Sequence, residues 1–104
     1  MIIATSSNIV GKETTKTFGV VRGNTVRARH VGKDIIAGLK TIVGGEIQEY
    51  TKLMAESREQ SIDRMVEEAK ALGANAIVDA RFATSYIMSN VAEILVYGTA
   101  VYVE

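Results

Sequence analysis

The sequence predicts an α+β fold in which a small antiparallel sheet packs on one long and one short helix. Three observations support this prediction. Between residues 46 and 72, apolar residues recur with a period near 3.6, which is typical of an amphipathic helix. The chain that follows alternates with a period of 2, which is typical of strands. Gly73 lies between the two patterns, where the end of a helix favours a residue that tolerates positive φ.

Composition limits the class of protein. A chain of 104 residues predicts one domain, 1–104. Twelve basic and twelve acidic residues cancel, which argues against nucleic acid as a partner. The sequence has no cysteine, so disulfides and thiolate metal sites are excluded. It also has no signal-peptide pattern and no run of about 18 apolar residues. We therefore expect a cytoplasmic protein with no membrane partner.

The N-terminal region is rich in β-forming residues. Residues 1–10 predict one or two short strands around a turn. Residues 17–29 are rich in Val, Thr and Phe and predict a strand with a bulge or bend near Gly23-Asn24. A hairpin turn at Gly23-Asn24 is the alternative.

Helical spacing begins at residue 33. Residues 33–43 predict the short helix, Gly44-Gly45 breaks the chain, and residues 46–72 predict the long helix. The long helix would span about 40 Å, whereas a compact domain of this size has a radius of gyration of about 13 Å. We therefore expect part of its apolar stripe to face another subunit. The stripe consists of Ile47, Tyr50, Met54, Ile62, Met65, Ala69 and Leu72.

Two strands are predicted after the long helix, at 75–88 and 93–103, with a turn between them. The last strand is apolar on both faces, although a strand of an antiparallel sheet usually has one wet face. This pattern again indicates association between subunits. One face carries Ile94, Val96, Ala100 and Tyr102, and the other carries Leu95, Tyr97, Val101 and Val103.

His30 and Asp34 are the candidate metal ligands. His30 is the only histidine, and Asp34 follows it by four residues, so the pair could share a metal ion or a proton. One histidine and one carboxylate fall short of the usual three or four protein ligands, but an oligomer could multiply them by symmetry. The alternative is a histidine at a junction with no ligand role.

Gly44-Gly45-Glu46 precedes the long helix. Glycines before a helix can let backbone N–H groups approach an anion. The Lys-Ser/Thr of a phosphate-binding loop is absent, and Glu46 would itself favour the positive end of the helix. A simple corner between two helices is the alternative.

Arg58 falls on the apolar stripe, between Met54 and Ile62, with Ser57 and Ser61 nearby. A polar position there suggests a buried ion pair or a hydrogen-bonded network at an interface. Binding of a small anionic ligand and simple snorkelling to solvent are the alternatives. The candidate partners, in the same chain or a neighbouring one, are Glu46, Glu49, Asp79 and Glu93.

No enzyme signature is apparent in the sequence. Asp79 and Arg81 share a predicted strand face, which suggests a cross-strand salt bridge. No serine lies in a nucleophile elbow, and no general base is placed by a motif. We therefore expect a protein that is not an enzyme.

These segments together resemble the YbjQ-like family of small bacterial and archaeal proteins. The resemblance covers nearly the whole chain, and each piece is specific only in combination with the others. The matching segments are Ile42-Val43-Gly44-Gly45-Glu46, Tyr50, Arg58, Ala69-x-x-Leu72-Gly73-Ala74-Asn75-Ala76-Ile77-Val78 and Tyr97-Gly98-Thr99-Ala100-Val101, with Thr5, Gly11, Gly19-Val20-Val21 and Gly23 upstream.

The resemblance implies a ring-shaped homopentamer with a dodecin-like subunit and no established enzymatic activity. The family carries the label "putative heavy-metal-binding", which implies a metal ion as a cofactor. Some relatives have acidic residues after Asn75, where this chain has Arg81-Phe82-Ala83-Thr84-Ser85, so a carboxylate metal site is disfavoured there. The candidate ligand or interface positions are Gly44, Gly45, Glu46, Tyr50, Arg58, Asn75, Gly98 and Thr99.

Three functions follow from this reading. The first is a non-enzymatic, homo-oligomeric binding protein that holds a metal ion or a small anion at the ring axis or at subunit interfaces. The second is a structural or adaptor ring that acts through protein partners. The third is a small enzyme with an active site at the subunit interface.

Overall fold

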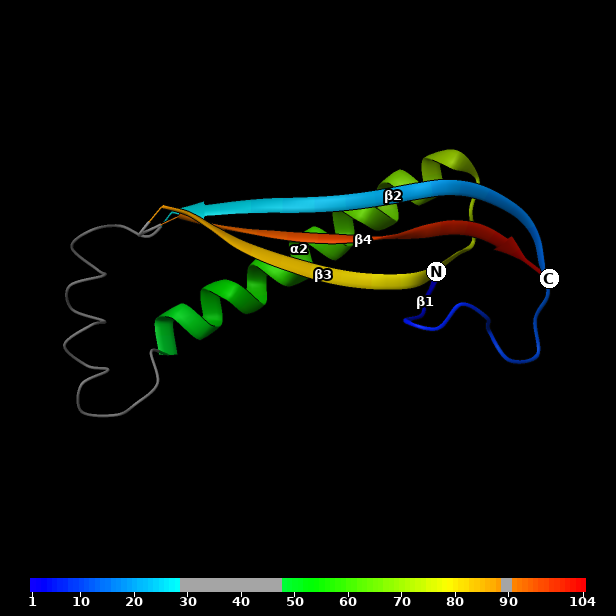
Figure 1. Ribbon diagram of the computed structural model, residues 1–104, viewed down its shortest axis with the longest axis horizontal. Coiled ribbons are helices and arrows are strands. Elements are labelled where there is room, and N and C mark those ends of the chain that lie inside the picture. The colour runs from blue at the N-terminus through cyan, green and yellow to red at the C-terminus, as the bar shows by residue number, and fades with distance from the viewer. Residues whose placement is uncertain (29–47, 89–90) are drawn as a thin grey trace.

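The computed structural model describes residues 1–28, 48–88 and 91–104. These residues form four strands and one helix, and Figure 1 shows the helix lying diagonally across one face of the sheet. The predicted helix over 33–43 and part of the turn between the last two strands lie outside the described residues. The elements are β1 (Ile2–Ile3), β2 (Thr14–Ala28), α2 (Gln48–Leu72), β3 (Ala76–Met88) and β4 (Val91–Val103).

The sheet is mixed, with the strand order β1-β3-β4-β2. β4 pairs antiparallel with both β2 and β3, as the sequence predicts for the last two strands. β1 pairs parallel with β3, so the prediction of a purely antiparallel sheet is wrong at this edge. The reason is that β1 and β3 are separated in the chain by α2, and a connection of this length allows parallel pairing.

α2 ends as the sequence predicts. Gly73 adopts a φ of 94°. Its N–H donates to the carbonyl of Lys70 at 3.0 Å, and the N–H of Ala74 donates to the carbonyl of Ala69 at 3.1 Å. These two bonds form a Schellman motif, which satisfies carbonyls that the helix would otherwise leave unpaired. The chain turns here and enters β3 within three residues.

β2 runs straight through Gly23, so the prediction of a bend or hairpin there is wrong. Gly23 pairs with Val96 in an unbroken register, and the irregularities of β2 lie near its start, between Thr14 and Gly19. Gly23 is required because α2 crosses directly over it. A Cβ at this position would lie 2.0 Å from the carbonyl oxygen of Ser61.

The main core lies between α2 and the sheet. Val21 of β2, Met65 of α2 and Val96 of β4 are fully buried in it. A second cluster lies on the other face, at the end of the sheet where β3 begins and β4 ends, and Ile9 of the N-terminal segment packs against it. This second cluster consists of Ala76, Val78, Val101 and Val103. The two buried faces of β4 confirm its predicted apolar pattern, except that Tyr97 and Tyr102 are exposed.

A bulge in β3 exchanges the two faces of that strand. The register with β4 shifts between Val78 and Arg81, and Asp79 adopts a φ of 54°. The N-terminal segment docks at this bulge, because the N–H of Asp79 donates to the Ser6 carbonyl and the N–H of Ala80 donates to the Ala4 carbonyl, both at 3.0 Å. The cross-strand salt bridge predicted for Asp79 and Arg81 is wrong among the described residues. Asp79 instead accepts a hydrogen bond from the Ser7 hydroxyl at 2.8 Å, and Arg81 donates to the Thr5 carbonyl at 2.8 Å.

Candidate functional site

The buried polar centre of α2 is formed by Ser57 and Ser61, which flank Arg58 in the sequence. Ser57 and Ser61 are fully buried, whereas Arg58 is exposed. The Thr25 hydroxyl of β2 donates to the Ser57 carbonyl at 3.2 Å and lies 3.0 Å from the Ser61 hydroxyl. Ser61 also donates to the Ile94 carbonyl of β4 at 3.2 Å. A buried network therefore exists within the subunit, but it is built by hydroxyl groups and does not include Arg58. The interface role of Arg58 stays a prediction.

The position of Arg58 follows from the helical period. Gln60 and Arg64 lie on the flank of α2 that faces β2, where Arg27 donates to Gln60 and Arg64 donates to the Asn24 carbonyl at 2.6 Å. Residue 58 is turned about 100° from the buried row of Ser57 in the opposite sense, so Arg58 lies on the flank towards β3. Within the described part of the chain, Arg58 has no hydrogen-bond or ion-pair partner.

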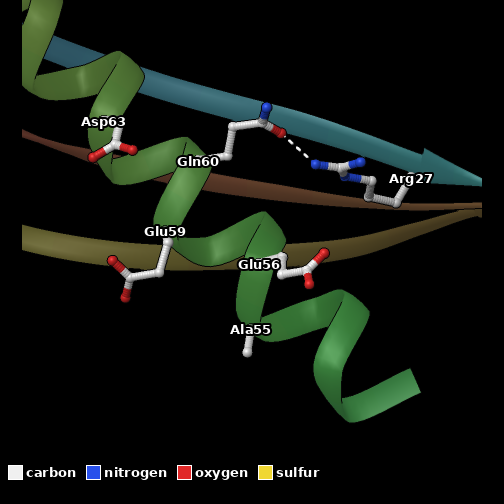
Figure 2. Close-up of a pocket in the computed structure, with 6 residues that line it drawn as sticks. All are labelled: Arg27, Ala55, Glu56, Glu59, Gln60 and Asp63. Atoms are coloured by element: carbon white, nitrogen blue, oxygen red, sulfur yellow. Dashed lines mark hydrogen bonds between the residues drawn. The ribbon is translucent and has the colours of Figure 1, made fainter. Parts of the chain in front are cut away.

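An open groove of about 530 Å³ lies on the β2 flank of α2. Figure 2 shows that the Arg27–Gln60 hydrogen bond joins β2 to α2 across it. The carboxylates of Glu56 and Glu59 point in different directions, and that of Glu59 points away from Arg27 (Figure 2). The lining residues are Arg27, Ala55, Glu56, Glu59, Gln60 and Asp63. This groove is a candidate site for a cation or a basic side chain, but its carboxylates do not converge on one point.

The described residues contain no group of three or more His, Asp or Glu side chains that could hold a metal ion. His30 and Asp34, the metal candidates from the sequence, lie outside those residues, as do Gly44, Gly45 and Glu46. Tyr50 lies in the first turn of α2. The part of the chain that the structure describes therefore does not fit a metal centre within one subunit.

The motif positions after α2 serve the fold. The Asn75 amide donates to the Val103 carbonyl and its carbonyl accepts from the Val103 N–H, both at 2.8 Å, as a backbone pair would. Gly98 is needed because a Cβ there would lie 2.7 Å from Ile77 Cγ2. Thr99 is half-buried on the opposite face of β4. These residues do not come together with Arg58 to form a site.

Strand register does bring together three residues that the sequence did not indicate as a group. Arg22 of β2 and Arg81 of β3 both pair with Tyr97 of β4, one on each side. All three lie on the sheet face opposite α2, because their neighbours Gly23 and Val96 face the helix. We call this set the arginine row. Only the register of three strands could reveal it, since its members are 59 and 16 residues apart in the chain.

Large apolar side chains are exposed on both faces of the sheet. α2 packs mainly against β2 and β4, and leaves the helix-side face of β3 open. Phe82 and Tyr86 on that face are 50% and 70% exposed. On the other face, Val20 of β2 is 61% exposed. Exposed apolar side chains gathered along strands are typical of surfaces that bind another protein.

The fold and these surfaces define a small α+β protein with a mixed sheet, a single covering helix among the described residues, and apolar strands that lack a cover. The chain belongs to the family whose model is described as "Putative heavy-metal-binding" and which matches residues 1–104. No helix in the described ranges is both long and apolar enough to cross a membrane.

Curated relatives support this assignment, and one solved structure shares the fold. A UPF0145 protein of Methanosarcina acetivorans is 57% identical over 101 residues, which cover 97% of this chain and 95% of the relative. A UPF0145 protein of Dehalococcoides mccartyi is 53% identical over 104 residues, which cover both chains fully. The crystal structure of a protein of unknown function from Pediococcus pentosaceus has a TM-score of 0.72 at 14% identity, covers 100% of this chain and 98% of its own, and shows the fold alone.

Proposed function

We propose that this protein is a non-enzymatic, homo-oligomeric binding protein, assembled as a pentameric ring, that holds a small anion or a metal ion at its subunit interfaces. The observation that carries the proposal is the uncovered sheet. Its apolar side chains and its free strand edges are both suited to contact a second copy of the chain.

The free edges support a ring rather than a two-fold dimer. β2 forms one edge of the sheet over its whole length. At the other edge, β1 pairs only with Ala76 and Ile77, so the side of β3 that faces away from β4 has no strand partner from Arg81 onward in the described part of the chain. Two different free edges favour head-to-tail pairing of β2 with β3 of the next subunit. Such contacts between unlike surfaces close into a ring when the rotation between subunits is right.

The uncovered face of β3 supports the same assembly. Phe82 and Tyr86 of β3 lie on the helix side of the sheet, and Arg58 lies on the flank of α2 nearest to them. A neighbouring subunit that covers this surface would bury the two aromatic rings and bring a partner within reach of Arg58. This placement retains the candidate role of Arg58 at an interface.

A small anion fits the described residues better than a metal ion does. These residues offer unpaired arginines, but they offer no cluster of three metal-ligating side chains. A metal site in the ring would need ligands from several subunits, with His30 and Asp34 as candidates.

Native mass spectrometry of the untagged protein tests the proposal. We expect a pentamer that carries a reproducible extra mass, which would identify the ligand class. A clean pentamer without added mass, together with no binding tighter than about 1 mM in dialysis against metals and anions, would favour the adaptor ring. A monomer would overturn the assembly and every interface site that depends on it.

Arg58→Met separates assembly from folding. Because Arg58 is exposed and unpaired within the described residues, we expect the free energy of unfolding of the subunit to change by less than about 0.5 kcal/mol. The fraction of pentamer in native mass spectra should fall, and Lys52→Met, on the same helix, should leave it unchanged. Unchanged assembly with loss of bound ligand would instead assign Arg58 to ligand binding.

A further inference from the structure

The two flanks of α2 differ in charge. Fully buried residues recur at every fourth position of the helix, so the residue before each of them faces β2 and the residue after it faces β3. On the flank towards β3, Arg58 lies between the half-buried side chains of Met54 and Ile62. Arg58 is therefore a single charge in an apolar stretch. The fully buried residues are Ser57, Ser61, Met65 and Ala69.

The flank towards β2 borders the groove, and this groove is acidic. Its carboxylates are those of Glu56, Glu59 and Asp63. The one cation that lines it, Arg27, is already bonded to Gln60. Within the described residues, the three carboxylates have no hydrogen-bond or ion-pair partner. Like charges three and four residues apart on a helix repel each other, so a cation from outside the subunit would stabilise this flank.

Head-to-tail pairing of subunits places the two flanks opposite each other. When β2 of one subunit lies beside β3 of the next, the groove of the first subunit faces the Arg58 flank of the second across the uncovered face of β3. A closed ring whose axis runs along the strands involves rotation without a shift along that axis. Arg58 then lies at the level of Glu56 and Glu59 of its neighbour, because these positions are within two residues of it in the chain.

We propose that Arg58 of each subunit enters the acidic groove of the next subunit and pairs there with Glu56 and Glu59. The occupant of the groove is thus a second copy of this chain. The contact rests on the head-to-tail ring of the proposed function and names the surface that Arg58 meets in it.

An arginine suits this groove better than a metal ion does. The carboxylates of Glu56 and Glu59 point in different directions (Figure 2), so they do not surround one point. A guanidinium group presents five N–H donors in a planar fork and can bond to carboxylates on more than one side. The groove, of about 530 Å³, has room for the side chain. Phe82 and Tyr86 lie on the β3 face between the two helices, where they would shield the ion pair from water and salt.

Charge reversal on each side of the contact tests the pairing. Arg58→Glu, and separately the double variant Glu56→Lys/Glu59→Lys, should raise the protein concentration at which half of the pentamer dissociates by about tenfold or more in native mass spectra, because each places like charges in contact. The triple variant restores opposite charges at every interface, and this concentration should return to within about threefold of the wild-type value. The side chains are exposed and unpaired within the described residues, so urea unfolding of the subunits should be unchanged.

Lys70→Glu and Glu67→Lys are the matched controls, because they reverse the same charges at exposed positions of α2 outside the groove. Lys70 lies on the flank of Arg58, about three turns further along the helix. Each control should change the dissociation of the pentamer less than twofold. If the controls weaken the pentamer as much as the reversals at the contact do, net charge explains the effect and the proposal is overturned.

The remaining outcomes separate the contact from the ring. A wild-type pentamer that both reversals leave intact would overturn the contact, while the ring would stand. Dissociation by both reversals without recovery in the triple variant would also overturn it, since the two surfaces would then lie in the interface but not against each other. An intact pentamer of Glu56→Lys/Glu59→Lys that loses a bound cation would assign the groove to that cation instead. A monomeric wild-type protein would overturn the ring and the contact together.

Discussion

At the scale of single residues, β2 and α2 approach each other closely at Gly23. A Cβ there would meet the Ser61 carbonyl oxygen at 2.0 Å and the Met65 nitrogen at 2.6 Å. Both are backbone atoms, which cannot rotate away as a flexible side chain could. The glycine therefore sets how deeply the helix lies on the sheet.

Gly23→Ala should be strongly destabilising. The helix would have to move away from the sheet, and we expect a loss of about 3 kcal/mol or more in the free energy of unfolding. Urea denaturation followed by circular dichroism measures this loss. Gly11→Ala is the control, because Gly11 has positive φ but open space around it, so strain alone should cost about 1 kcal/mol. Equal losses in both variants would contradict the role of the close contact.

The buried hydroxyls of Thr25 and Ser61 should act as a unit. Because the two hydroxyls lie 3.0 Å apart in a buried site, and each also bonds a backbone carbonyl, Ser61→Ala should cost about 1–3 kcal/mol in the free energy of unfolding. The double variant with Thr25→Val should cost less than the sum of the two single losses. A double-mutant cycle in urea measures the difference, and additivity within about 0.4 kcal/mol would show that the two hydroxyls are independent.

How much of the site the sequence could reveal depends on side-chain size and period. The sequence indicates polar residues in the centre of the α2 stripe. The prediction centred on Arg58, because a charge on an apolar stripe is a stronger signal than the small hydroxyl groups of Ser57 and Ser61. The buried face rotates along the helix as α2 crosses the strands diagonally, so Ser57 and Ser61 replace the expected larger residues. Single-sequence periodicity assumes a fixed face and cannot detect this rotation.

At the scale of elements, the end of α2 was predictable and the course of β2 and β3 was not. Gly73 stands at a boundary between two periods, and its Schellman bonds follow from local chemistry. In the sequence, Gly23 looks like a strand breaker. A glycine is needed there because the strand contacts α2, which comes much later in the chain. The bulge at Asp79 has no glycine to mark it, and it depends on docking of the N-terminal segment.

Gly73→Ala tests the helix end. Alanine at a φ of 94° is strained, so we expect a loss of about 1 kcal/mol in the free energy of unfolding. Thermal and urea unfolding should agree on this value. Glu67→Ala, at an exposed position of the same helix, should be neutral within about 0.5 kcal/mol. A neutral Gly73→Ala would show that the turn has another conformation in solution.

At the scale of the whole molecule, the subunit is elongated. Its Cα radius of gyration is 17.1 Å, and its extents are 53 × 23 × 16 Å. A compact chain of this length would have a radius of gyration near 13 Å. An elongated subunit with a long, partly uncovered sheet buries less surface on its own, so association would add stability that the single chain lacks.

Phe82→Ser should reduce assembly more than it reduces subunit stability. The Phe82 side chain is half exposed in the subunit, so removing its aromatic group lowers the free energy of unfolding of the monomer only a little. In the proposed pentamer, a neighbouring subunit that covers β3 would lose its contact with the buried aromatic side chain. We therefore expect the variant to dissociate at higher protein concentration than the unmodified protein does in native mass spectra. Glu68→Ala, on exposed α2, should leave the assembly intact. An unaffected pentamer would exclude the face of β3 from the interface.

The central position of β4 determines when the sheet can form during protein synthesis. β2 and the long part of β3 pair only with β4 among the described strands, and β4 follows both of them in the chain. β2 must therefore leave the ribosome without its hydrogen-bond partner and wait while more than sixty further residues are made. Pairing over such a separation is slow, because a long loop must close before any contact is gained. The antiparallel part of the sheet can therefore form only once β4 has emerged.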